Sequence, residues 1–183
     1  ISYSDLNKPP NVVAWRKSRG YLIDFEYGEP RSSGYQSYSA DVLRALSSSG
    51  DAKAIMILAD TLLAQKHWDE PQELLFLASV YGYTNSLVRM ANLSLNLAYT
   101  EKDEGAKRLN AIEAYSWLET AVTRGDIQAN RLIEQHQFDF SVDEQEKIRH
   151  LAELNYKKLV GKRQELGMDE FDNSYPEELI GHY

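Results

Sequence analysis

Apolar residues recur at helical spacing along most of this 183-residue chain. Over residues 51–66 they fall at i, i+3, i+4 and i+7 offsets, which places them on one face of an α-helix. Further stretches of the same kind predict helices over residues 74–81, 88–99, 106–123, 128–135 and 142–166. No segment shows convincing alternation of apolar and polar residues, the pattern of a half-buried strand. The pattern therefore predicts an all-α protein.

The last predicted helix carries a start signal and a stop signal. Ser141 precedes Glu144 by three residues, the spacing of a capping box. Gly167 stands where the helix should end, because glycine adopts the left-handed C-cap conformation without strain. Acidic residues also gather at the start, where the helix dipole favours negative charge: Asp139, Asp143, Glu144 and Glu146. The alternative, a small acid-dependent hydrolase, needs a pocket and a carboxylate of raised pKa.

Three glycines separate predicted helices in similar sequence contexts. They lie 32 and 43 residues apart, and the residue four positions after each is small: Gly50 with Ala54, Gly82 with Ser86, and Gly125 with Ala129. Small side chains let two helices approach closely, and glycine permits the positive φ of a helix C-cap. A period in this range is typical of helix-pair repeats, which must stack to bury their apolar faces.

These observations predict a short right-handed α-solenoid of antiparallel helix pairs. We expect four regions: an N-terminal cap (residues 1–38), about three repeats (39–137), a long C-terminal capping helix (138–167) and a tail (168–183). The N-terminal region holds five of the twelve tyrosines, so an exposed aromatic contact surface is the alternative to a cap.

Two of the three tryptophans are interpreted from their place in the chain. Trp15 is expected to lie under the N-terminal cap. Trp68 lies in a predicted loop, where packed and exposed positions are equally open.

The third repeat carries the most specific motif. Residues 114–129 read AYSWLETAVTRGDIQA, in which six residues share one signature: Ala114, Trp117, Ala121, Gly125, Asp126 and Ala129. This segment resembles the Sel-one-like repeat of the tetratricopeptide-like superfamily, although Leu118, Thr120 and Val122 depart from it. The resemblance extends over residues 39–137 with one strong and two degenerate repeats. The resemblance implies that Trp117, at a packing position of the family, lies in the core. It also implies a non-catalytic adaptor that holds a protein partner on a concave surface, frequently in the bacterial envelope.

The resemblance also implies which positions face that partner. The corresponding residues are polar and rich in amides, which can donate and accept hydrogen bonds at once: Lys53, Asp60, Asn85, Asn92, Asn96, Gln128, Arg131 and Gln135. The alternative is that these are ordinary solvent-facing helix positions.

Composition narrows the chemistry further. The chain has 28 acidic and 20 basic residues, a net charge of −8, and no basic stripe, which argues against nucleic acid as a partner. The absence of cysteine excludes thiolate chemistry. The four histidines have no metal-ligand spacing, and no phosphate-binding loop or nucleophile motif occurs. We therefore expect neither a metal nor a cofactor.

The function predicted from these observations is a non-enzymatic protein–protein interaction module. Two alternatives stay open: an immunity protein that neutralises a basic secreted toxin, and the sensor domain of a membrane protein. The apolar runs are shorter than a membrane span requires, so we expect a soluble chain. Because the chain opens at Ile1, we expect an upstream targeting segment, membrane tether or trimmed start. The predicted location is the periplasm or cell envelope, with the cytoplasm as the alternative.

Overall fold

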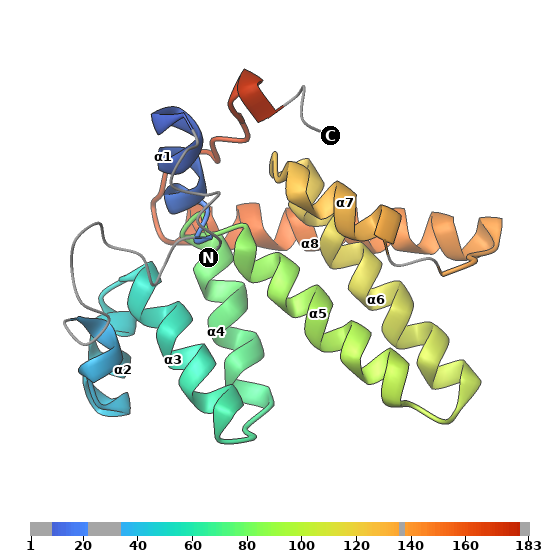
Figure 1. The fold of residues 1–183 in the computed structure, drawn as a ribbon, viewed down its shortest axis with the longest axis horizontal. Coiled ribbons are helices and arrows are strands. Elements are labelled where there is room, and N and C mark those ends of the chain that lie inside the picture. Colours follow the sequence, from blue (N-terminus) through green and yellow to red (C-terminus); the bar gives the residue numbers. More distant parts are fainter. Residues whose placement is uncertain (1–8, 22–33, 136–137, 180–183) are drawn as a thin grey trace. The chain divides into compact units, whose positions relative to one another are not determined.

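The computed structural model describes residues 9–21, 34–135 and 138–179, and this part of the chain is helical without a strand. The all-α prediction is confirmed. The helices are α1 (Pro10–Ser18), α2 (Ala40–Ser48), α3 (Ala52–Ala64), α4 (Asp69–Val80), α5 (Asn85–Thr100), α6 (Glu104–Thr123), α7 (Ile127–Gln135) and α8 (Val142–Glu165), with short 3-10 turns η2 (Tyr35–Ser37) and η3 (Glu177–Leu179) (Figure 1). None of the helices in these ranges is long and apolar enough to cross a lipid bilayer.

The chain divides into two compact units, which are described separately below. The first unit comprises residues 1–83 and 174–183, and the second comprises residues 84–173.

The first unit is built on α3. This helix packs against α2 on one side and forms an antiparallel hairpin with α4 on the other (Figure 1). Its apolar stripe is buried together with one residue of α2, in a cluster of Leu43, Ala54, Ile57, Leu58 and Leu62. Burying such side chains removes each of them from water and stabilises the unit by roughly 1.5–3 kcal/mol per large residue.

Helix α1 was not predicted, because its apolar residues are irregularly spaced. Pro10 occupies its first turn, where a missing N–H costs nothing. The C-terminal segment covers this helix: the Trp15 Nε1 and the Arg19 Nη2 each donate to the carbonyl oxygen of Ser174 at 3.0 Å. Asn11 Nδ2 donates to Glu178 at 2.6 Å. Trp15 is therefore buried, as expected, but the C-terminal segment supplies part of its cover.

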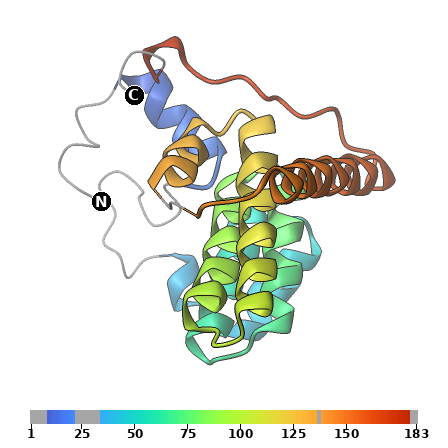
Figure 2. The ribbon, with the colours of Figure 1, turned by 90° about the vertical axis from the view of Figure 1, so that its right-hand side faces the viewer.

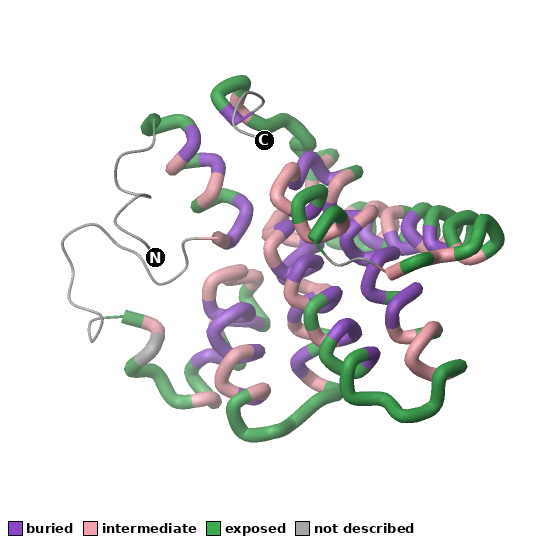
Figure 3. Tube along the Cα trace, turned by 45° about the vertical axis from the view of Figure 1, so that its right-hand side comes forward, coloured by how far each residue is buried: buried purple, intermediate pink, exposed green. Residues whose placement is uncertain are grey.

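The second unit is built on α6, which packs against α5, α7 and α8. The α5–α6 pair runs side by side in both ribbon views (Figures 1 and 2). The buried positions of α6 lie from Ala111 onward, and its first turns are exposed or half-buried (Figure 3). Where α8 crosses α6, the Asn155 Nδ2 donates to Ser116 Oγ and the Thr120 hydroxyl donates to the Ala152 carbonyl, both at 3.3 Å.

The recurring glycine turns adopt the predicted conformation. Gly50, Gly82 and Gly125 have φ of 87°, 108° and 75°. The small residues that follow them are completely buried: Ala54, Ser86 and Ala129. The aspartates of two turns have a capping role, since Asp51 accepts from the Ala54 N–H at 3.0 Å and Asp126 accepts from the Gln128 N–H at 3.1 Å. The motif therefore stabilises a helix end and a close helix approach in each turn.

Other local predictions can also be compared with the structure. The capping box of Ser141 and Glu144 is present at the start of α8, and Gly167 has a φ of 65° after its end. Trp117 is buried. The open question at Trp68 is resolved in favour of exposure, because 59% of its surface remains accessible.

Candidate protein-binding surface

The eight predicted partner-binding residues lie on three helices. Four are exposed and four are half-buried. In the first unit, α3 carries Lys53 and Asp60, and the Lys53 Nζ lies 4.9 Å from the centre of the Tyr35 ring. The N-terminal region therefore covers part of the surface that the sequence assigned to a partner. In the second unit, α5 carries Asn85, Asn92 and Asn96, and α7 carries Gln128, Arg131 and Gln135. The pairs Asn92–Asn96 and Arg131–Gln135 are each brought together on successive turns of one helix.

A different surface of the second unit is hollowed. Three adjoining hollows of about 650, 330 and 280 Å³ lie along one side of α8. The first two share Glu119 and Arg149 in their lining, and the second and third share Tyr156. None of the eight predicted residues lines any of these three hollows.

The lining residues of α8 form a continuous strip. They recur every three or four residues, which places them on one side of the helix: Gln145, Ile148, Arg149, Ala152, Glu153, Tyr156, Lys157, Val160, Arg163 and Gln164. From α6 come Tyr115, Glu119 and Thr123, at intervals of four. At 1.5 Å per residue the strip is roughly 30 Å long. We call this row of hollows the α8 groove.

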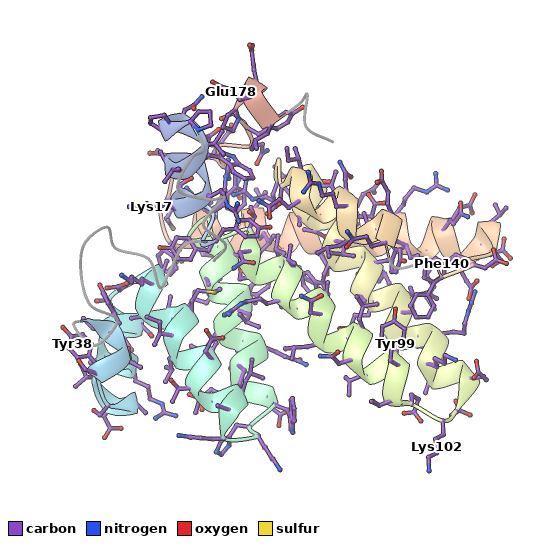
Figure 4. The ribbon with its side chains drawn as sticks, in the orientation of Figure 1. Lys17, Tyr38, Tyr99, Lys102, Phe140 and Glu178 are labelled. Carbon is purple, nitrogen blue, oxygen red and sulfur yellow. The ribbon has the colours of Figure 1, made fainter. Side chains whose placement is uncertain are left out.

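An aromatic cluster lines the end of the groove at the start of α8. Tyr115 meets the rings of Phe138 and Phe140 edge to face, with ring centres 6.1 and 4.8 Å apart. Phe138 and Phe140 are stacked, and Tyr99 of α5 contacts Phe138; Figure 4 shows Tyr99 and Phe140 at this end of the unit. The guanidinium of Arg108 lies 5.3 Å from the centre of Phe140. The groove thus begins with an apolar, ring-lined hollow.

The Tyr115 hydroxyl is the polar group in this cluster. Tyr115 is 6% exposed, and its hydroxyl makes no hydrogen bond of ordinary geometry to the described residues. Burial raises the pKa of Tyr115, although the backbone of Phe138 lowers it in part. The hydroxyl therefore keeps its proton at neutral pH and is covered by its neighbours.

The acidic residues near this end of the groove have no arrangement suited to acid catalysis. Arg108 donates to both carboxylate oxygens of Glu144 and to the Asp139 carbonyl. The hydrogen bond from Arg108, together with the Ser141 backbone N–H, lowers the pKa of Glu144 to about 2. Asp139, Asp143 and Glu146 have exposed side chains. Glu144 is thus fully ionised at neutral pH, the opposite of the raised pKa that the hydrolase alternative requires.

At the other end of the groove the segment after α8 forms part of the lining. The Phe171 ring contacts two guanidinium groups: its centre lies 3.5 Å from the Arg124 Cζ and 4.6 Å from the Arg163 Cζ. Arg124 is 1% exposed and donates to the Asp172 carbonyl at 3.3 Å and to the Asn173 side chain. The carboxylates of Asp169, Glu170 and Asp172 are exposed, but Phe171 between them in the sequence is anchored.

Sequence reasoning missed this groove for an identifiable reason. The resemblance directed attention to α3, α5 and α7, whereas the groove follows α8. A signal was present in the strip of Ile148, Ala152, Tyr156 and Val160, but the expected capping role of α8 already explained these apolar positions.

No cluster of three or more potential metal ligands occurs in residues 9–21, 34–135 and 138–179. His67 and His150 are exposed, whereas His136 and His182 lie outside the described ranges. Comparisons with family models, with curated proteins and with solved structures find no significant match to this chain.

Proposed function

We propose that this protein is a non-catalytic interaction module that binds a protein partner in the α8 groove. The proposal rests on the groove, which is roughly 30 Å long. Aromatic rings line one end of it, and residues of both charges line the rest. Interfaces favour this combination of aromatic anchors, arginine and a polar rim. The groove also lies on two helices of regular structure, which hold its shape before a partner arrives.

The finer fold prediction belongs to this proposal. The glycine turns at Gly50 and Gly125 each join two helices that pack together, α2 with α3 and α6 with α7, which supports a Sel-one-like arrangement of helix pairs. In that arrangement the polar positions of α5 and α7 form another candidate binding surface in the second unit, and those of α3 form one in the first unit. These surfaces involve other helices than α8, so an experiment can separate them.

Single cysteines provide that experiment, because the chain has none of its own. Lys157 lines the groove, and its neighbour Lys158 lies on the opposite side of α8 and is also exposed. We would attach a photo-crosslinker to Lys157→Cys, Lys158→Cys and Asn96→Cys and expose each to extract of the native cells. The two lysine variants lose the same charge from the same helix, so each controls for the other.

The proposal expects one partner to crosslink from position 157 and not from position 158. The substitution Arg149→Ala, at an exposed residue that lines the first two hollows, made together with Lys157→Cys, should reduce that crosslink while the melting temperature of the protein changes little. Crosslinking only from position 96 would assign the partner to the polar surface of α5 and reject the α8 groove. Equal crosslinking from 157 and 158 would also reject it.

A further inference from the structure

The segment that follows α8 is held as a bound peptide is held. Residues 168–173 have no regular secondary structure, and one aromatic ring anchors them. The main chain is also bound, since Arg163 donates to the Asp169 carbonyl and Arg124 to the Asp172 carbonyl. One side-chain anchor combined with main-chain hydrogen bonds is a common mode of peptide recognition.

The receptor side of this contact is preformed by the helices. Arg124 follows the last turn of α6, and Tyr156 and Arg163 lie on the groove strip of α8. The Phe171 ring packs against Tyr156 with ring centres 6.3 Å apart, and the Asn173 Nδ2 donates to the Tyr156 hydroxyl at 3.4 Å. Arginine is suited to this task because its planar guanidinium can stack on a ring and still donate in the plane. We call Arg124, Tyr156 and Arg163 the tail seat.

A close backbone approach is also built into the seat. At Gly125 a Cβ would collide with the Asn173 carbonyl. The seat therefore accommodates a main chain directly above Gly125.

We propose that the tail seat is a recognition site for extended peptides with one aromatic side chain flanked by carboxylates, and that residues 168–173 occupy it in the absence of a partner. The segment itself defines this chemistry, since Asp169, Glu170 and Asp172 surround Phe171. The two arginines donate to main-chain carbonyls and the Asn173 side chain, and their positive charge adds a longer-range attraction for carboxylates beside the ring. The inference rests on the proposed function, because it treats the end of the α8 groove as part of a binding surface.

The tail seat favours replacement of residues 168–173 by another peptide over departure of the segment that leaves the seat empty. Arg124 is buried under the segment, and a buried cation that loses its covering groups is costly unless another ligand replaces them. A tethered segment is present at an effective concentration on the order of millimolar. A partner must therefore compete with it, and the intact chain should bind such a peptide more weakly than a chain whose own anchor has been removed.

The probe for this experiment is a fluorescein-labelled synthetic peptide of the chain's own residues 167–174, GMDEFDNS, with GMDEADNS as its control. Fluorescence anisotropy would measure its binding to the intact chain, to Phe171→Ala and to Phe171→Ala/Arg163→Ala. We expect Phe171→Ala to bind the peptide at least tenfold more tightly than the intact chain. The double variant and the control peptide should each lose at least tenfold in affinity. Equal affinity of the intact chain and Phe171→Ala, or equal binding of both peptides, would overturn the inference.

A second measurement does not depend on the folding of Phe171→Ala. A spin label on Glu170→Cys, an exposed position, reports the mobility of the segment in a chain that keeps Phe171, Arg124 and Arg163. Excess GMDEFDNS should mobilise the label and GMDEADNS should not; mobilisation by both or by neither contradicts exchange. Crosslinking from Lys157→Cys remains a separate readout. Failure of the peptide with normal crosslinking removes this inference alone, whereas peptide exchange without crosslinking removes the wider proposed function.

Discussion

Gly125 offers the sharpest test of how the tail is held. Its φ of 75° lies in the left-handed region, and the site of a Cβ is occupied by the Asn173 carbonyl. Gly167 has a similar φ of 65°, and nothing lies within 4 Å of its Cβ position. The two substitutions Gly125→Ala and Gly167→Ala therefore share a backbone cost and differ in the collision with the tail.

The expected magnitudes follow from these two costs. A left-handed conformation costs a residue with a Cβ roughly 1–2 kcal/mol, and this applies to both variants. Forcing an atom into a filled space adds roughly 1–3 kcal/mol, and this applies to Gly125→Ala alone. The loss of entropy in the unfolded chain on replacing glycine is common to both and cancels in the comparison. We expect Gly125→Ala to reduce the free energy of unfolding by about 1–3 kcal/mol more than Gly167→Ala does.

The assay should follow the second unit specifically, because two compact units need not unfold in one transition. Trp117 lies in that unit, so its fluorescence can be followed during urea denaturation in a background where Trp15 and Trp68 are phenylalanine. Adding Phe171→Ala to both variants releases the anchor of the tail and should remove most of the difference between them. Equal destabilisation by Gly125→Ala and Gly167→Ala in the chain that keeps Phe171 would refute the close approach of the tail.

Three further predictions concern the packing and charges of the two units. Arg108 holds the pKa of Glu144 at about 2, below its usual value of 4.5. The pair therefore stabilises the native state at pH values above 4.5, and this contribution is lost as the pH falls towards 2. Glu144→Gln should flatten that part of a plot of unfolding free energy against pH. Substitution of the exposed Trp68 by alanine should change the unfolding free energy by less than about 0.5 kcal/mol, whereas Trp117→Ala should cost roughly 3–5 kcal/mol by urea denaturation. Asp126→Ala should cost about 1–3 kcal/mol, since Asp126 is fully buried and accepts hydrogen bonds from the Thr84 hydroxyl and the Gln128 N–H; a loss below 0.5 kcal/mol would show that these bonds contribute little.

The helices and their turns could be predicted because their signals are local. The capping box at Ser141, the positive φ at Gly125 and the apolar stripe of α3 each depend on residues within about two helical turns. The burial of Trp117 was predicted from the repeat motif, in which it stands at a packing position. Local patterns are reliable where neighbours along the helix decide the structure.

The groove and the tail seat could not be predicted in this way. The contact of Arg124 with Phe171 joins residues that are far apart in the sequence, and a single phenylalanine among acidic residues has the composition of a solvated tail. Helix α1 was missed for the same reason, since Trp15 is held by the carbonyl of Ser174 rather than by a periodic apolar face. In each case a long-range partner supplies what the local pattern lacks.

The three glycine turns show how one sequence motif acquires different structural roles. A Cβ at Gly50 would approach the Tyr81 hydroxyl at 2.9 Å, a Cβ at Gly82 would meet nothing within 4 Å, and a Cβ at Gly125 would collide with the backbone of the tail. The positive φ explains why glycine recurs at all three turns, because that requirement is local to a helix end. It does not explain the close contacts around the Cβ positions of Gly50 and Gly125, which come from different segments of the chain. The collision at Gly50 involves the end of the Tyr81 side chain and can be relieved by rotation of that side chain. The collision at Gly125 involves the backbone of Asn173 and cannot be relieved in this way. The motif that marks the repeats therefore also sets, at its third occurrence, how closely the tail can approach the seat.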